Sequence, residues 1–125
     1  MAYTLSDVEW AYDSMLDSPS TRPLGKCKIY CRANKYTVLR RTTDAGTKIA
    51  VNGHRLALMK KMQTVNIPEG VQASHLCHKP GCVEIDHISP ETDLVNKSRK
   101  ACEQRRLCLG HPGYPMCIFQ MGCIY

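Results

Sequence analysis

The sequence lacks the long apolar run and the aromatic content on which many proteins of its size depend. No stretch approaches the roughly 18 consecutive apolar residues of a membrane span, so we expect no membrane partner. Its 125 residues include one tryptophan and one phenylalanine. The first residues show neither the basic nor the apolar region of a secretory signal, so we expect reduced thiols, as in a nuclear or cytoplasmic protein. A single domain, over 1–125, with so few large side chains usually needs a further source of stability.

Eight cysteines offer that source. In a secreted protein of this size they would indicate four disulfides, and a disulfide-stapled extracellular domain is one interpretation. However, four of the five histidines lie among the cysteines of the C-terminal half. Cysteine and histidine at short spacings form zinc sites, so metal binding is the favoured interpretation.

Positive charge is absent from the first 20 residues, which hold four acidic side chains. The 17 lysines and arginines therefore face only seven acids in the rest of the chain. A basic body of this kind indicates a polyanionic partner, most simply DNA, although a solubilising surface would have the same charge. The acidic segment, 1–20, is expected to form a helix that begins at Ser6, pairs Ser6 with Glu9 in a capping box, and ends near Asp17.

The remaining chain alternates turns with short strands and helices, which predicts an α+β fold. Val8, Ala11, Tyr12, Met15 and Leu16 would form the buried face of the first helix. Apolar alternation and turn residues then predict a loop over 18–26, strands over 36–41 and 47–51, a helix over 54–62 and a strand over 71–76.

One Cys/His group falls in the stretch from Ser74 to His87. Cys77, Cys82 and His87 follow a Cys-x4-Cys-x4-His pattern, and Pro80-Gly81 allows the tight reversal between the two thiols. A structural zinc ion takes four ligands. The fourth must come from Cys27 or Cys31, of which we prefer Cys27.

A second group contains four ligands without help. A helix is expected to begin with Ser89 as its N-cap and Pro90 at its first position, and to run through Ala101. Its inner stripe would be Leu94, Val95, Ala101 and Cys102. The ligands of a second zinc ion would then be Cys102, Cys108, His111 and Cys117.

His75 and Asn96 are needed by neither zinc ion. A histidine on a strand and an asparagine on a helix, facing each other, could activate water and hold Mg²⁺. A packed histidine and a solvated helix residue explain the same two residues, and spacing by itself favours that second interpretation.

The stretch from Ser74 to His78, followed by Cys82, His87, Asn96 and Cys102, resembles the His-Cys box homing endonucleases. These are a branch of the ββα-metal (His-Me finger, HNH-like) nucleases. The resemblance spans Cys27 to Cys117. It implies a small zinc-stabilised ββα-metal nuclease fold with an N-terminal helix and an antiparallel β-sheet. The implied activity is Mg²⁺-dependent hydrolysis of DNA, with a sequence-biased double-strand cut made by a homodimer.

The same resemblance assigns roles to residues. His75 would be the general base, Asn96 would hold the Mg²⁺, and Arg40, or less well Arg41, would steady the phosphate. Both zinc ions would be structural. Residues 27–76 would form a β-rich DNA-binding part, 74–117 the zinc-bound nuclease core, and 118–125, which includes Cys123, an apolar tail that packs on its own or a partner protomer. A zinc-stabilised DNA-binding module without catalysis is the alternative function.

Overall fold

Helix α1 (Leu5–Asp17) opens the computed structural model, which describes residues 3–119. Its N-cap is Thr4, whose hydroxyl accepts from the backbone of Asp7 while the Asp7 carboxylate accepts from the backbone of Thr4. The predicted capping box at Ser6 and Glu9 is therefore wrong, because Thr4 and Asp7 make the same pair two residues earlier. The predicted end and buried face are confirmed, with Leu16 half-buried at its edge.

A first hairpin follows where a loop was predicted. Strand β1 (Thr21–Leu24) pairs antiparallel with β2 (Cys27–Tyr30). Pro23 lacks a backbone N–H, but β1 has only one neighbouring strand and can accommodate proline there. The Thr21 hydroxyl donates to the backbone oxygen of Met15 at 2.6 Å, which fixes the hairpin under the end of α1.

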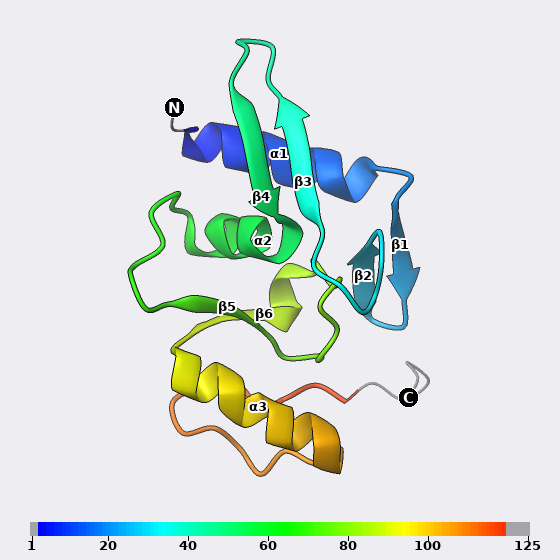
Figure 1. Cartoon of the computed structure of the whole chain (residues 1–125), viewed down its shortest axis with the longest axis vertical. Coiled ribbons are helices and arrows are strands. Elements are labelled where there is room, and N and C mark those ends of the chain that lie inside the picture. The colour runs from blue at the N-terminus through cyan, green and yellow to red at the C-terminus, as the bar shows by residue number, and fades with distance from the viewer. Residues whose placement is uncertain (1–2, 120–125) are drawn as a thin grey trace.

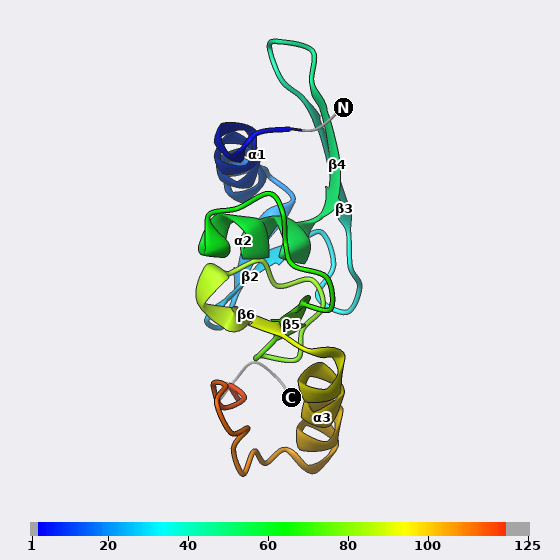
Figure 2. The same ribbon diagram turned by 90° about the vertical axis from the view of Figure 1, so that its left-hand side faces the viewer.

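The second hairpin matches the predicted strands to within two residues. Strand β3 (Val38–Thr42) pairs with β4 (Lys48–Asn52), and Leu39, Ile49 and Val51 face the core. Figures 1 and 2 show the hairpin reaching past α1 at one end of the molecule, while α3 lies at the other end. Helix α2 (Gly53–Met62) follows, as predicted, and contributes four buried apolar side chains at the centre of the core.

The C-terminal half contains the strand predicted over 71–76 and a second strand that was not predicted. Strand β5 (Gln72–His75) pairs antiparallel with β6 (Ile88–Glu91), which follows the 3-10 turn η1 (Ile85–His87). Ser89 and Pro90 belong to β6, so the helix start predicted for them is wrong. Helix α3 (Asp93–Arg105) begins instead after its N-cap Thr92.

The inner stripe predicted for α3 is confirmed at Cys102 only, because Leu94 and Ala101 are exposed and Val95 is half-buried. Leu94 is 80% exposed, and only Arg99 and Cys102 of this helix are buried. Strands β5 and β6 with α3 form a ββα unit. Three antiparallel strand pairs and three α-helices in the described part of the chain give the predicted α+β class. Within residues 3–119, no helix is both long enough and apolar enough to cross a bilayer.

Candidate active site and metal centres

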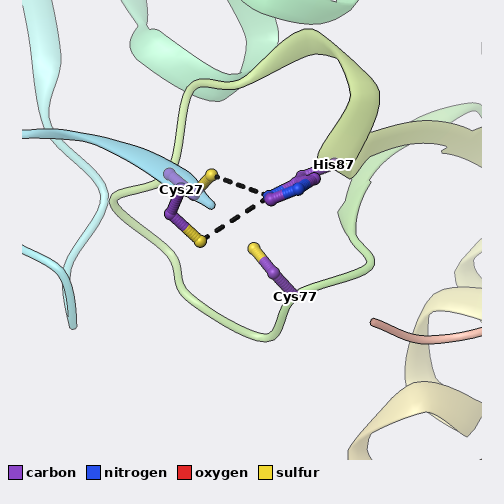
Figure 3. Close-up of side chains that lie close together, drawn as sticks. Cys27, Cys77 and His87 are labelled. Carbon is purple, nitrogen blue, oxygen red and sulfur yellow. Dashed lines mark hydrogen bonds between the residues drawn. The ribbon is translucent and has the colours of Figure 1, made fainter. Parts of the chain in front are cut away.

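The first Cys/His group joins three separate parts of the chain. Cys27 comes from β2, Cys77 and Cys82 from the loop after β5, and His87 from the end of η1. All four residues are buried, and their ligand atoms lie within 4.8 Å of one another. Figure 3 shows the labelled side chains of Cys27, Cys77 and His87 directed at a common space. Three sulfurs and one imidazole nitrogen fit a structural zinc ion.

Gly81 lets the Cys77–Cys82 loop lie against the chain that follows β2. The Gly81 carbonyl accepts from Tyr30 N at 2.9 Å, and Gly81 N donates to the Ala33 carbonyl at 3.0 Å. A Cβ atom at Gly81 would lie only 1.7 Å from the backbone oxygen of Arg32. This close approach brings Cys27, and not the half-buried Cys31, into the group.

The thiols of the first group favour the deprotonated form of Cys82. Hydrogen bonds from Cys27 and Cys77 lower the pKa of Cys82 to about 4. His87 presents Nδ1 to the sulfurs, at 3.5 Å from Cys82 Sγ and 3.6 Å from Cys27 Sγ. The deprotonated thiol and the ring nitrogen are the forms that a zinc ion binds.

The second predicted group is also brought together. Cys102 lies on α3, and Cys108, His111 and Cys117 lie in the chain after it, with ligand atoms again within 4.8 Å of one another. His111 Nε2 is 3.5 Å from the sulfurs of Cys102 and Cys117. Its Nδ1 lies 3.0 Å from the Ser98 hydroxyl, which itself donates to a backbone oxygen. Ser98 therefore accepts from Nδ1–H and leaves Nε2 free for a metal.

A cleft of about 220 Å³ lies between β5 and α3. His75, at the end of β5, and Asn96, on α3, both line it. Other polar residues of its wall are His78, Arg99, Lys100 and Glu103. The two residues that the sequence set 21 positions apart thus share one opening.

His75 is held in one tautomer. Its Nε2 lies 2.9 Å from the carbonyl of Cys82, to which it can only donate. Nδ1 is then the nitrogen that can accept a proton. Burial lowers the pKa of His75 to about 4, so the ring is neutral at neutral pH. A neutral, oriented imidazole beside a cleft is suited to general-base chemistry.

The side-chain amide of Asn96 is held in one orientation by a hydrogen bond from its NH₂ group. Nδ2 donates to the Gln72 side chain on β5 at 2.8 Å. The opposite atom, Oδ1, is a neutral oxygen of the kind that Mg²⁺ accepts as a ligand.

Comparison with known proteins identifies the family. Residues 17–125 match the model described as the zinc-binding loop region of homing endonuclease. The chain belongs to this family. No curated protein and no solved structure matches the sequence. The match confirms the resemblance to homing endonucleases and indicates a nuclease-like, DNA-related function. Together with the two donor sets, it supports two structural zinc ions in each chain.

Two aromatic rings next to His75 extend the site in this homing-endonuclease relative. Tyr36 stacks on His54 with ring centroids 4.4 Å apart, and His54 lies 5.1 Å from His75. Burial lowers the pKa of His54 to about 3. His54 is not among the site residues predicted from the sequence, since only the fold brings α2 beside β5.

The arginine predicted for the phosphate is not in the cleft. Arg40 is exposed on the outer face of β3 and does not contribute to the described wall around His75. Arg41 is turned the other way and donates from Nε to the Ser14 hydroxyl on α1 at 3.0 Å. Arg99 and Lys100 line this opening, and Arg55 lines the one beside it. The strand register explains the difference, because β3 alternates its side chains between α1 and solvent.

Proposed function

We propose that this protein is a Mg²⁺-dependent DNA endonuclease that hydrolyses phosphodiester bonds. The observation that carries the proposal is the shared cleft of His75 and Asn96, set between two Cys3His groups. Family membership supplies the link to DNA. Because each chain has one such cleft among its described residues, a sequence-biased double-strand cut would require a homodimer.

His75 would act as the general base. Nδ1 accepts a proton from the attacking water, and Nε2–H remains donated to the Cys82 carbonyl at 2.9 Å. That hydrogen bond orients the ring and stabilises the imidazolium after the proton has moved. The first zinc site is linked to His75 through Cys82, whose carbonyl accepts from His75 and whose sulfur would bind the zinc ion. A structural metal would therefore position the base without touching substrate.

Asn96 would hold the Mg²⁺. The wall of the cleft is mainly polar and offers Oδ1 as a neutral ligand, and Mg²⁺ commonly binds to few protein oxygens while it keeps several waters. The residues therefore fit the ion. When bound, Mg²⁺ would neutralise charge on the phosphate during its hydrolysis. Lys100, one turn along α3 from Asn96, is placed to attract the phosphate, a role that we transfer from Arg40.

The test is cleavage of supercoiled plasmid DNA by zinc-loaded protein in Mg²⁺. We expect the parent to give nicked and linear products, and His75→Ala and Asn96→Ala to lose at least about 100-fold in rate. Asn66→Ala, in the exposed loop after α2, is the matched control and should cleave like the parent. Zinc content of each variant establishes that it folds.

Two results would contradict the proposal. Equal cleavage by the parent and by His75→Ala would mean that the nuclease activity does not come from this cleft. DNA binding by the parent without any cleavage in divalent cations would instead support the alternative, a zinc-stabilised DNA-binding module. Retention of single-strand nicking by a monomer would remove only the homodimer from the proposal.

A further inference from the structure

Gln72 joins the strand of His75 to the helix of Asn96. It begins β5 three residues before His75, and its Oε1 accepts from Asn96 Nδ2 at 2.8 Å. Both residues line the opening next to the His75 cleft. The contact is between side chains only, so it acts on the orientation of the Asn96 carboxamide and not on the backbone pairing of β5.

The orientation of Gln72 is itself fixed. Its Nε2 donates to Asp93 Oδ1 at 3.1 Å, and the other carboxylate oxygen of Asp93 pairs with Lys97 Nζ at 2.9 Å. An ionised carboxylate can only accept hydrogen bonds. Gln72 must therefore direct its NH₂ group at Asp93 and its oxygen at Asn96. The sequence of contacts runs from Lys97 through Asp93 and Gln72 to Asn96.

We infer that Gln72 is a positioning residue, which holds the Asn96 carboxamide with Oδ1 toward the divalent cation. A carboxamide without such a partner can present either its oxygen or its NH₂ group to the cleft, and NH₂ cannot bind a cation. This inference rests on the proposed function, because it takes Asn96 to be the ligand of Mg²⁺. It adds a residue that supports the ligand without touching metal or substrate.

The variant Gln72→Met removes this contact with little risk to the fold. Gln72 is half-buried, and its backbone pairing with Glu91 across the β5–β6 ladder needs no side chain. Methionine keeps the length of the side chain but has no strong acceptor. Gln104→Met, on the exposed side of α3, is the matched control.

The experiment titrates isotope-labelled, zinc-loaded protein with Mg²⁺ alone and follows the side-chain carboxamide signals of Asn96 by NMR. We expect the Mg²⁺ concentration for half-maximal change to rise about tenfold in Gln72→Met. It should stay near that of the parent in Gln104→Met. Cleavage of plasmid DNA, measured in parallel, should show the same order of Mg²⁺ requirement.

The outcomes separate the inference from the proposed function. An unchanged Mg²⁺ requirement in Gln72→Met overturns the positioning role, whatever the protein does to DNA. A parent that shows no Mg²⁺-dependent change at Asn96 overturns both the ligand assignment and the inference. If the parent binds Mg²⁺ at Asn96 with the predicted dependence on Gln72 but cleaves no DNA, the inference holds and the nuclease function fails.

Discussion

Arg99 of α3 reaches back to Glu91 at the end of β6, and the two side chains are 2% and 1% exposed. Arg99 Nε donates to Glu91 Oε1 at 2.7 Å, and Nη2 donates to Oε2. The same guanidinium donates to the Pro115 carbonyl at 2.8 Å and to Cys117 Sγ at 3.3 Å. Because α3 buries only one other residue, Cys102, this ion pair is a main connection between the helix that carries Asn96 and the strand beside His75.

Replacement of Arg99 by methionine should therefore destabilise the protein strongly. The Glu91 carboxylate would remain buried without its partner, which costs about 3–5 kcal/mol. Urea unfolding of the zinc-loaded protein measures the loss. Arg105→Met, on the exposed last turn of α3, should change the free energy of unfolding by no more than about 0.5 kcal/mol. A loss below about 1 kcal/mol in Arg99→Met would show that the pair does not hold the helix.

Zinc content gives a second prediction. The parent should contain two zinc ions per chain, while Cys82→Ser and Cys108→Ser should each contain one, because each removes a ligand from a different Cys3His group. Cys31→Ser is the matched control and should keep two, since Cys31 is outside both groups. Native mass spectrometry counts the ions. Loss of a zinc ion from Cys31→Ser would place that thiol in the first site after all.

Gly81 provides a third prediction. A methyl group there would lie 1.7 Å from the Arg32 carbonyl oxygen, so Gly81→Ala must push the Cys77–Cys82 loop away from the segment that follows β2. We expect a loss of at least about 3 kcal/mol in stability, and weaker binding of the first zinc ion. Gly46→Ala, in the open β3–β4 turn at φ +87°, should cost only about 1 kcal/mol of backbone strain. Similar losses in the two variants would argue against the steric explanation.

The metal centres could be predicted from the sequence because zinc ligands follow local spacing rules. Cys77, Cys82 and His87 lie within eleven residues, and the second group lies within sixteen. Only the fourth ligand of the first site depends on the fold, and just two upstream cysteines compete for it. The α+β class was predictable for a similar reason, since most strands and helices carry their own periodicity and turn residues.

The parts that were missed depend on tertiary contacts. Ser89 and Pro90 have the residue types of a helix start, but pairing with β5 makes them a strand. Of the stripe predicted for α3 only Cys102 is buried, and the other buried residue is Arg99, since a buried carboxylate on β6 makes a charged side chain the better internal partner. The residues around Gln72 give no sign of its proposed role, because that role depends on a hydrogen bond with Asn96, 24 positions away.

We propose that the outer face of the β3–β4 hairpin is a surface that binds DNA. Arg40 and Thr42 on β3 and Lys48 on β4 are exposed, and Thr42 is directly opposite Lys48 in the register. A two-stranded ribbon fits the major groove of B-DNA, where basic side chains contact phosphates and base edges. Because Arg40 does not line the described cleft of His75, we expect it to contribute to binding and not to the chemical step.

The double variant Arg40→Ala/Lys48→Ala should weaken DNA binding and leave the cleavage rate at saturating DNA unchanged. Each lost phosphate contact lowers the slope of log Kd against log salt by about one, so the double variant should lose about two. Fluorescence anisotropy with a labelled duplex at several salt concentrations measures the slope. Lys60→Ala is the control, because its ammonium lies 3.3 Å from Glu9 on the acidic α1 and should not face the phosphates. An equal loss of slope in Lys60→Ala would show that net charge, and not the hairpin, governs binding, whereas a slower saturated rate in Arg40→Ala/Lys48→Ala would return Arg40 to the catalytic site.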